Sequence, residues 1–476
     1  MSKTSEKFTL VNSGGVKLKG FSLTKNSAKL MVNVFCLFSV FNATTSCTDE
    51  LVEEETVKNN SNVQKIEEKE ESGFVLNASA FLEDNHTIGS STAADMALQL
   101  RSCLLHEDVT RSTATVEDVY PIGFSKARTR SSESDTMAYV VDFSNGGGFA
   151  IVAADNRMAN PVLACVEQGS YEECMDNDGL QFFMEQAEEY IMQNAELFEY
   201  YKDSVNADSL FFELDATATR ATYRGTYFID YGYFDSYGPL LKTAWRQGAP
   251  YNQECPKKCS KYEPKTGCVP LAFAQVLAYW KYPTHISNTY MDWNLMLDNG
   301  KKTHDGDNDI NKPATKAISK LCKLLGNAFD SEYDCGETST NTKDAWEKVA
   351  SWGFKSDWDD YTYNYVKKHL AAGRPVVTRA RRSLTKGHSW VTDGCRRGYQ
   401  KKMAYVMSGS SFSESLVKEY NLYYLHHNWG WGGKGNGYFE ANVFNPTKPY
   451  ALDDESLKSS MNYDYTRNVN CFVIWR

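Results

Sequence analysis

The chain has 476 residues, of which 42% are hydrophobic and 24% are charged, and these proportions exclude wholesale disorder and a polytopic membrane protein. The net charge is -10, from 51 basic and 61 acidic side chains, so the composition gives no electrostatic basis for binding nucleic acid. The 12 cysteines are too sparse for a small scaffold held together by disulfides.

The N-terminal segment has the order of a secretory signal. Residues 1–29 carry six lysines and one glutamate, and residues 30–41 form an apolar run that is too short to span a bilayer as a helix. The small residues that follow end at Cys47, which resembles the lipid-modified cysteine of a bacterial lipoprotein. Residues 48–50 are similar to the acidic surface-export signals of lipoproteins in the Bacteroides group. We therefore expect residues 1–47 to be a signal with a lipid anchor at Cys47, and a plain cleaved signal peptide is the alternative.

An acidic segment follows the signal. Residues 48–73 contain nine acidic and three basic side chains and no aromatic residue. Such a segment cannot bury enough apolar surface to become ordered, so we expect residues 48–74 to be a solvated acidic tether. The predicted localisation is therefore the cell surface or outer membrane for a lipoprotein, or the medium for a secreted protein.

A first folded part is predicted over residues 75–220 and mixes helices with strands. Residues 138–143 and 149–153 are two β-rich runs separated by glycines, which predicts a hairpin. Residues 180–201 place apolar side chains at helical spacing.

The boundary of this part is a small, polar segment, residues 215–222. Such a segment predicts an exposed linker, where proteolytic cleavage concentrates. The part that follows, residues 221–476, is long enough for an enzyme built from two subdomains.

The strongest chemical signal is a cysteine at the start of a helix. Apolar side chains recur at helical spacing from Val269 to Trp280, and Pro283 ends the pattern. Cys268 is therefore predicted at the helix N-terminus, where the helix dipole stabilises a thiolate, and Gly267 lets the backbone approach closely just before it. The alternative is that Cys268 is a small buried hydrophobic residue, as most free cysteines are.

Two later motifs supply a base and groups that could orient it. His388 opens a β-rich run, so it would be held on a rigid element, as a general base requires. Residues 427–433 form a loop rich in glycine and tryptophan, in which Asn428 could orient the imidazole and Trp429 could shield that hydrogen bond from water. The alternatives are a structural histidine and a glycine-rich turn between two strands.

The order Cys, His, Asn is that of papain-like cysteine proteases, and the motifs resemble the streptopain family of bacterial cysteine peptidases. The resemblance spans about residues 235–445, and a further stretch, residues 137–171, resembles the propeptide of the family. The family includes interpain-like enzymes of gut and oral Bacteroidetes. Four motifs in the family's order carry the resemblance: Thr243 to Asn252; Gly267-Cys268-Val269 with Ala274-Gln275 and Tyr282-Pro283; Gly387-His388 with Asp393-Gly394; and His426 to Gly433.

The resemblance implies an α+β fold: a papain-like peptidase of a helical subdomain and an antiparallel β subdomain, preceded by an α+β prodomain. It implies that Cys268 is the nucleophile, that His388 is the general base and acid, and that Gln247 is an oxyanion-hole donor together with the Cys268 amide. Trp429 is expected to pack on the imidazole. Asn428 adjoins this tryptophan, whereas the orienting Asn of papain-like enzymes lies two residues before theirs, so a Cys-His dyad without an Asn partner stays open.

By the same resemblance, we expect the zymogen of a secreted or surface-anchored endopeptidase that cleaves peptide bonds through an acyl-enzyme. Residues 75–220 would act as its intramolecular inhibitor until cleavage near Arg220, and residues 221–476 would be the catalytic domain. The expected partners are protein or peptide substrates, and we expect a monomer with no cofactor and no metal. Cys255 and Cys259 are one cysteine more than the family has there; a disulfide or a chance pair is favoured over zinc, because no further ligands stand at ordinary spacing.

Two alternative functions use the same fold. The first is a catalytically silent surface-binding protein, although binding gives no reason to keep Cys268, His388 and Gln247 together. The second is an acyltransferase with the same dyad, which differs from a peptidase in whether an amine or water accepts the acyl group.

Overall fold

The computed structural model describes the chain with gaps, and the expected signal and tether lie outside the described residues. The described ranges are 86–105, 114–123, 136–158, 160–201, 213–214, 222–256, 259–260, 262–297, 312–381, 387–408, 411–444 and 469–476.

The chain divides into two compact units. The first contains the described residues within 64–204, 229–401 and 419–476, and it includes every residue proposed for the site. The second contains the described residues 213–214, 222–228, 402–408 and 411–418. Within the second unit, β5 (Glu213–Leu214) pairs antiparallel with the start of β6 (Thr222–Tyr237).

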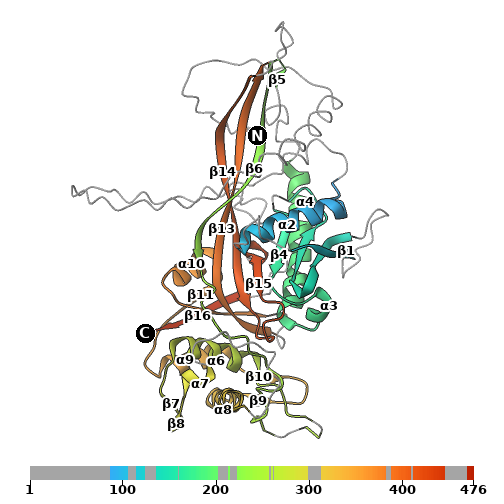
Figure 1. The fold of residues 1–476 in the computed structure, drawn as a ribbon. Coiled ribbons are helices and arrows are strands. Elements are labelled where there is room, and N and C mark those ends of the chain that lie inside the picture. Colours follow the sequence, from blue (N-terminus) through green and yellow to red (C-terminus); the bar gives the residue numbers. More distant parts are fainter. Residues whose placement is uncertain are drawn as a thin grey trace, which may run out of the picture. The chain divides into compact units, whose positions relative to one another are not determined.

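The N-terminal part of the first unit is an antiparallel sheet between two helices (Figure 1). Successive side chains of the strand that contains Val140 and Val141 pack on opposite faces of the sheet. Val140 packs in the core that contains α4 side chains, and Val141 packs in the core that contains α2 side chains. The predicted hairpin is confirmed by the pairing of Ala138 with Ala153. The elements are α2 (Ser90–Leu104), β1 (Val116–Gly123), β2 (Thr136–Phe143), β3 (Phe149–Ala153), β4 (Val162–Val166), α3 (Tyr171–Cys174) and α4 (Asp178–Tyr201).

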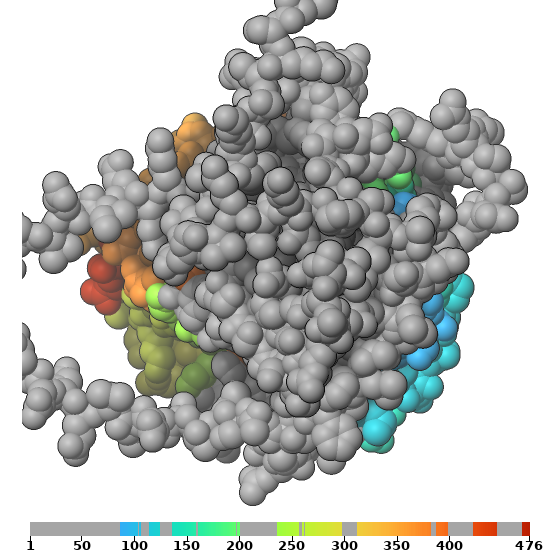
Figure 2. All heavy atoms as spheres, turned by 90° about the horizontal axis from the view of Figure 1, so that it is seen from above, coloured from blue at the N-terminus to red at the C-terminus, as the bar shows by residue number. Residues whose placement is uncertain are grey.

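Residues of α2 and β1 form part of the outer surface of this part. Residues of α2 and β1, drawn in blue and cyan, are exposed in the space-filling view of Figure 2.

The helix α4 covers the predicted range 180–201, so the helix predicted from the apolar periodicity is confirmed there. None of the described helices has the length and apolar character that crossing a membrane requires.

The sheet continues from β4 into the C-terminal part of the chain. The order is β1-β2-β3-β4-β15-β14-β13-β12-β16-β11, and β4 pairs antiparallel with β15. One sheet therefore joins the expected prodomain to the expected catalytic domain. The added strands are β11 (Lys355–Asp360), β12 (Val376–Arg381), β13 (Gly387–Ser408), β14 (Ser411–Asn428), β15 (Gly437–Glu440) and β16 (Val469–Trp475).

A helical subdomain surrounds α6 (Cys268–Trp280). Ten consecutive residues of α6, from Val269 to Ala278, are buried, and they pack with α7, α8 and α9 in a separate core. These helices and the antiparallel sheet confirm the predicted α+β fold with a helical and a β subdomain. The remaining elements are β7 (His285–Ile286), β8 (Thr289–Tyr290), α7 (Trp293–Met296), α8 (Pro313–Ala328), β9 (Glu332–Tyr333), β10 (Thr338–Ser339), α9 (Thr342–Ala350), α10 (Tyr363–Ala371) and the 3-10 helices η2 (Ser144–Gly146) and η4 (Ala441–Phe444).

Candidate active site

Cys268 is the first residue of α6, as the sequence predicts. The backbone amides of Cys268 itself, Val269 and Ser389 face its sulfur and lower the pKa of the thiol. The preceding Gly267 has a φ of 91°, and a Cβ there would lie 3.1 Å from Cγ2 of Thr338. Because a side chain at this position would be strained and crowded, glycine is what lets the chain turn into the helix at the nucleophile.

His388 lies on β13 close to Cys268. The amide of the adjacent residue, Ser389, faces the Cys268 sulfur and lowers the pKa of the thiol, so the fold brings Cys268 and His388 together. The Nε2 atom of His388 lies 3.3 Å from the carbonyl oxygen of Trp429, which can accept its hydrogen. The imidazole stacks on Trp390, with ring centroids 6.0 Å apart and an interplanar angle of 16°.

Burial is the largest influence on the pKa values of Cys268 and His388. Burial raises the pKa of the Cys268 thiol, and the nearby Asp178 carboxylate raises it further, against the lowering effect of the backbone amides. Burial lowers the pKa of His388, although Asp178 opposes this shift. Although Cys268 remains partly exposed, the neutral thiol and neutral imidazole are favoured in the full-length chain. The thiolate expected from the sequence is therefore not favoured while residues of the N-terminal part are docked.

Gln247 lies next to the nucleophile segment. Its side chain is buried. Its backbone carbonyl oxygen accepts a hydrogen bond of 2.9 Å from the backbone amide of Thr266, two residues before Cys268. The same segment contacts the tryptophan loop, because the amide of Gly432 donates to the carbonyl of Trp245 at 3.1 Å. The three segments that contain Cys268, Gln247 and Trp429 thus meet at one place.

Asn428 is buried at the same place, but its hydrogen bonds go to groups other than His388. Its Nδ2 donates to the carbonyl of Thr243 at 2.8 Å, and its Oδ1 accepts from Nε2 of Gln275 at 3.4 Å and from the amide of Gly430 at 3.2 Å. The Asn428 amide therefore fixes the loop, and the hydrogen-bond acceptor at the imidazole is a backbone carbonyl.

Trp429 is almost fully buried, at 1% exposure. Its indole packs against Trp390 and Phe439, with centroid distances of 5.0 and 5.1 Å. Trp390 is the ring that stacks on His388. Trp429 therefore contacts the imidazole in two ways, indirectly by packing on Trp390 and directly through its own carbonyl oxygen.

Two residues of the site were not predicted from the sequence. Trp390 stands two residues after His388 on the same strand, and the period-two alternation of β13 could have indicated that both side chains lie on one face. Asp178 has no local signal, because its approach to Cys268 depends on how α4 docks.

The N-terminal part packs directly on the tryptophan loop. The backbone of Gly179, in the first turn of α4, leaves no space for a Cβ beside the indole of Trp429. Lys434 in the same loop forms an ion pair of 3.1 Å with Glu173. Residues of α3 and α4 therefore cover the loop that contacts His388.

A buried ion pair lies at the junction of the two parts. His426 Nδ1 lies 2.6 Å from Asp393, and its Nε2 lies 3.5 Å from Glu167, which follows β4. Burial lowers the pKa of His426, but the two carboxylates outweigh it and raise the value to about 10. His426 is therefore charged at neutral pH, and one of its two partners comes from the N-terminal part.

The cysteines before the nucleophile do not pair with each other. Cys259 forms a disulfide with Cys335, in the turn between β9 and β10, whereas Cys255 is free and buried beside Tyr333. Among the described residues, no group of three or more His, Cys, Asp or Glu side chains is arranged to hold a metal ion. The disulfide partner, Cys335, was not predicted from the sequence.

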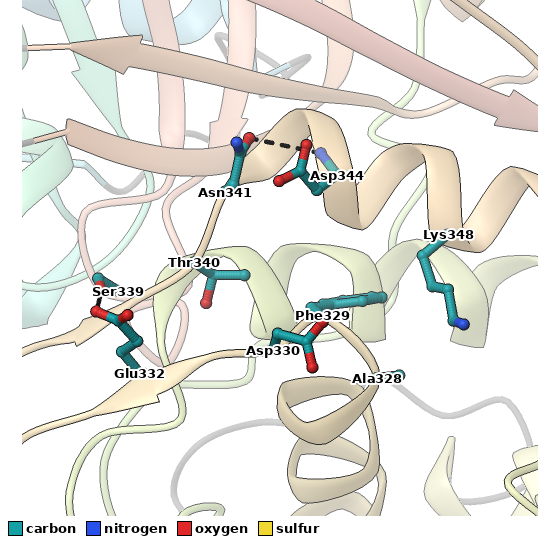
Figure 3. Close-up of a pocket in the computed structure, with 9 residues that line it drawn as sticks. All are labelled: Ala328, Phe329, Asp330, Glu332, Ser339, Thr340, Asn341, Asp344 and Lys348. Carbon is teal, nitrogen blue, oxygen red and sulfur yellow. Dashed lines mark hydrogen bonds between the residues drawn. The ribbon is translucent and has the colours of Figure 1, made fainter.

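A cavity of about 450 Å³ lies between the end of α8, β9 and the start of α9 (Figure 3). The chain segment along its wall contacts the segments that contain Cys268 and His388: Thr338 donates to the Lys265 carbonyl at 2.6 Å, and the Thr342 hydroxyl lies 3.0 Å from the Ser389 hydroxyl. The lining residues are Ala328, Phe329, Asp330, Glu332, Ser339, Thr340, Asn341, Asp344 and Lys348.

A cysteine at a helix N-terminus, opposed by a histidine on an antiparallel sheet, defines a cysteine peptidase. Comparisons with known proteins agree, since residues 245–439 match the Peptidase C10 family and residues 93–191 match the Spi protease inhibitor family. Streptopain from Streptococcus pyogenes is 24% identical over 425 residues, which cover 79% of this chain and 90% of the relative. The chain is thus a cysteine peptidase that resembles the streptopain family.

Other relatives are more distant or partial. The thiol protease/hemagglutinin PrtT of Porphyromonas gingivalis is 26% identical over 253 residues, which cover 44% of this chain and 25% of that protein. A fragment of prointerpain A from Prevotella intermedia has a TM-score of 0.48 and 21% identity, and covers 75% of this chain and 98% of the fragment. Active interpain A from the same organism has a TM-score of 0.35 and 22% identity, and covers 50% and 95% of the two chains.

Proposed function

We propose that the chain is the precursor of an exported cysteine endopeptidase that cleaves protein substrates through Cys268 and His388. The observation that carries the proposal is the position of Cys268 at the N-terminus of α6, where its sulfur faces the amide of Ser389, the residue beside His388. A helix N-terminus and a neighbouring histidine are the two features that activate a cysteine as a nucleophile.

The hydrogen bond to Trp429 decides which imidazole nitrogen reacts. In a neutral imidazole, one nitrogen donates and the other accepts. Since Nε2 of His388 donates to the Trp429 carbonyl, Nδ1 is the nitrogen that takes the proton from Cys268. The resulting imidazolium keeps its Nε2 hydrogen bond, and Nδ1 then donates the proton to the leaving amine.

The chemical steps follow from this placement. The Cys268 thiolate attacks the carbonyl carbon of the scissile bond, and the negative oxygen accepts hydrogen bonds from the Cys268 amide and the Gln247 side chain. Loss of the amine leaves a thioester on Cys268, and water activated by His388 releases the acid product. In this scheme Asn428 and Trp429 act by holding the loop and its carbonyl oxygen in place.

Residues 75–220 act as the intramolecular inhibitor in this proposal, and residues 221–476 as the catalytic domain. The contacts of Gly179 with Trp429 and of Lys434 with Glu173 support this role, as does the match of residues 93–191 to a protease inhibitor family. Release after cleavage near Arg220 would remove the carboxylate of Asp178 and admit water. Both changes lower the pKa of Cys268, so the thiolate forms after release.

The proposed route to the cell exterior rests on the sequence of the N-terminal segment. Residues 1–47 act as the export signal and residues 48–74 as the tether, with Cys47 as the lipid anchor of a surface or outer-membrane lipoprotein. The active enzyme is proposed to be a monomer that acts on proteins and peptides and needs no cofactor.

The test replaces the nucleophile. Cys268→Ala in the full-length chain is expected to abolish cleavage of casein and labelling by an irreversible thiol-reactive inhibitor. Cys255→Ala, at a buried free cysteine outside the site, is the matched control and is expected to keep both. Casein cleavage that persists in Cys268→Ala would show that the proposed function is wrong. Mass spectrometry of the same samples over time gives the processing site and its dependence on Cys268.

A further inference from the structure

Three buried polar side chains form a closed ring of hydrogen bonds beneath the active site. Thr243, Gln275 and Asn428 are each at most 4% exposed. The Thr243 hydroxyl donates to Oε1 of Gln275 at 2.8 Å, and Nε2 of Gln275 lies 3.4 Å from Oδ1 of Asn428. Nδ2 of Asn428 closes the ring by donating to the carbonyl of Thr243 at 2.8 Å.

Each member of the ring belongs to a segment that also contains a group of the proposed chemistry. Thr243 lies four residues before Gln247. Asn428 directly precedes Trp429, whose carbonyl oxygen lies beside Nε2 of His388. Gln275 lies two helical turns after Cys268, so the two side chains leave α6 on the same side.

The ring also lies between two hydrophobic cores. The buried neighbours of Gln275 on α6 belong to a core that includes residues of β12, β13 and β16, whereas Trp429 belongs to the other core. Gln275 is the polar member of a run of ten buried residues in α6, where burial of an amide is costly unless it is hydrogen-bonded. Its hydrogen bonds reach Thr243 on one side and Asn428 on the other.

We propose that Gln275 is a positioning residue for the peptidase reaction, which couples the nucleophile helix to the tryptophan loop and to the Gln247 segment. The inference rests on the proposed Cys-His mechanism. Asn428 Oδ1 also accepts from the Gly430 amide, so the ring fixes the backbone on both sides of Trp429. The Trp429 carbonyl is thereby held at Nε2 of His388 while α6 holds Cys268.

The physical consequence is a geometric one. If the ring is broken, the loop and α6 shift relative to each other, and the imidazole loses its alignment with the Cys268 sulfur. A misplacement of about 1 Å can lower a catalysed rate about a hundredfold. Substrate binding depends less on this alignment, so the loss falls on kcat rather than on KM.

The experiment compares Gln275→Leu, Thr243→Val and the double variant, each made as the full-length chain. Precursors are processed with a trace of tagged wild-type enzyme that is then removed, and active sites are counted by covalent labelling. Measurements are kcat and KM for a peptide substrate, the pH profile of Cys268 alkylation by iodoacetamide, and the melting temperature. Thr315→Val, at a buried threonine of α8 outside the ring, is the matched control.

We expect Gln275→Leu to lower kcat about tenfold or more with KM within about twofold, and to move the alkylation midpoint of Cys268 to higher pH. Because the ring acts as a unit, the double variant should lose no more kcat than the less active of the two single variants. The control should keep both the wild-type kcat and the wild-type midpoint.

A kcat within about twofold of wild type, with an unchanged alkylation midpoint, overturns the inference even if the melting temperature falls. If Gln275→Leu does not fold, Thr243→Val decides by the same criteria, since it removes a single hydroxyl. Failure of the proposed function is distinguishable, because it would appear as activity that survives Cys268→Ala.

Discussion

The backbone of Gly179 lies against the indole of Trp429 so closely that no side chain fits between them. Gly179 belongs to the first turn of α4, and the carbonyl oxygen of Trp429 meets Nε2 of His388. The N-terminal part of the chain is therefore in contact with the loop that orients the proposed base.

Gly179→Ala should weaken this contact. A Cβ would overlap the Trp429 ring, and overpacking of this kind costs about 1–3 kcal/mol. Since the cost falls on the docked state, we expect faster labelling of Cys268 in the full-length precursor and faster processing. Gly89→Ala is the control, because a Cβ at Gly89 meets nothing within 4 Å. Equal labelling rates in the two variants would contradict the prediction.

Asp178→Asn should make Cys268 more acidic in the precursor. The carboxylate raises the pKa of the thiol because it opposes the thiolate, so removing the charge lowers that pKa. We expect the alkylation profile of Cys268, followed by peptide mass spectrometry, to shift to lower pH. Asp178 is exposed, so the shift should shrink as salt is added. Asp176→Asn, at an exposed carboxylate in the turn before α4, should leave the profile in place.

Glu440 should make the precursor less stable as the pH rises. Burial raises the pKa of this carboxyl to about 7, although hydrogen bonds from Asn442 and Asn160 oppose the shift. The folded state thus favours the protonated acid, while the unfolded chain ionises near its ordinary value of 4.5. Stability is full below that value and falls as the pH rises through about 7, by an amount on the order of 3 kcal/mol. The phenol of Tyr361 faces the same site, and burial raises its pKa well above the ordinary value, so it stays neutral throughout this range.

The measurement uses the Cys268→Ala precursor, which prevents self-processing. We expect the melting temperature of Glu440→Gln relative to its parent to increase between about pH 5 and pH 8. Glu347→Gln on the exposed side of α9 should show no such trend. A pH-independent difference for Glu440→Gln would mean that Glu440 is already ionised in the folded chain.

The Cys259–Cys335 disulfide should stabilise the catalytic part. The two residues are 76 apart in sequence, and closing a loop of this size contributes about 2–4 kcal/mol. Cys335→Ser should lower the urea midpoint, and the double variant with Cys259→Ser should lose no more, since both changes break one bond. Dithiothreitol should bring the parent down to the level of the variant without affecting the variant. Equal midpoints before reduction would argue that the bond is absent in solution.

The elements that sequence patterns predicted are those specified locally. The hairpin of β2 and β3 follows from two β-rich runs around glycines, and α4 and α6 follow from apolar side chains at helical spacing. Cys268 was placed correctly at the start of α6, because Gly267 and Pro283 mark the two ends of the pattern.

The groups around the imidazole were less predictable. The sequence offered the Asn428 side chain as a partner for His388 and left a dyad without it open, whereas the acceptor is the carbonyl oxygen of Trp429. Every residue has a carbonyl, so its use leaves no mark in the sequence. The stacking ring is Trp390, and this choice depends on how β13 faces the loop.

By itself, the sequence predicted the α+β class and the position of Cys268 at the start of α6, because these depend on residue type and on spacing within one segment. Only the tertiary structure decided what bonds to His388, which cysteine pairs with Cys259, and that Asp178 approaches Cys268. The physical reason is that these contacts join segments far apart in the chain. Their geometry is set by the packing of α4, α6 and the sheet against one another, and no local pattern records that packing.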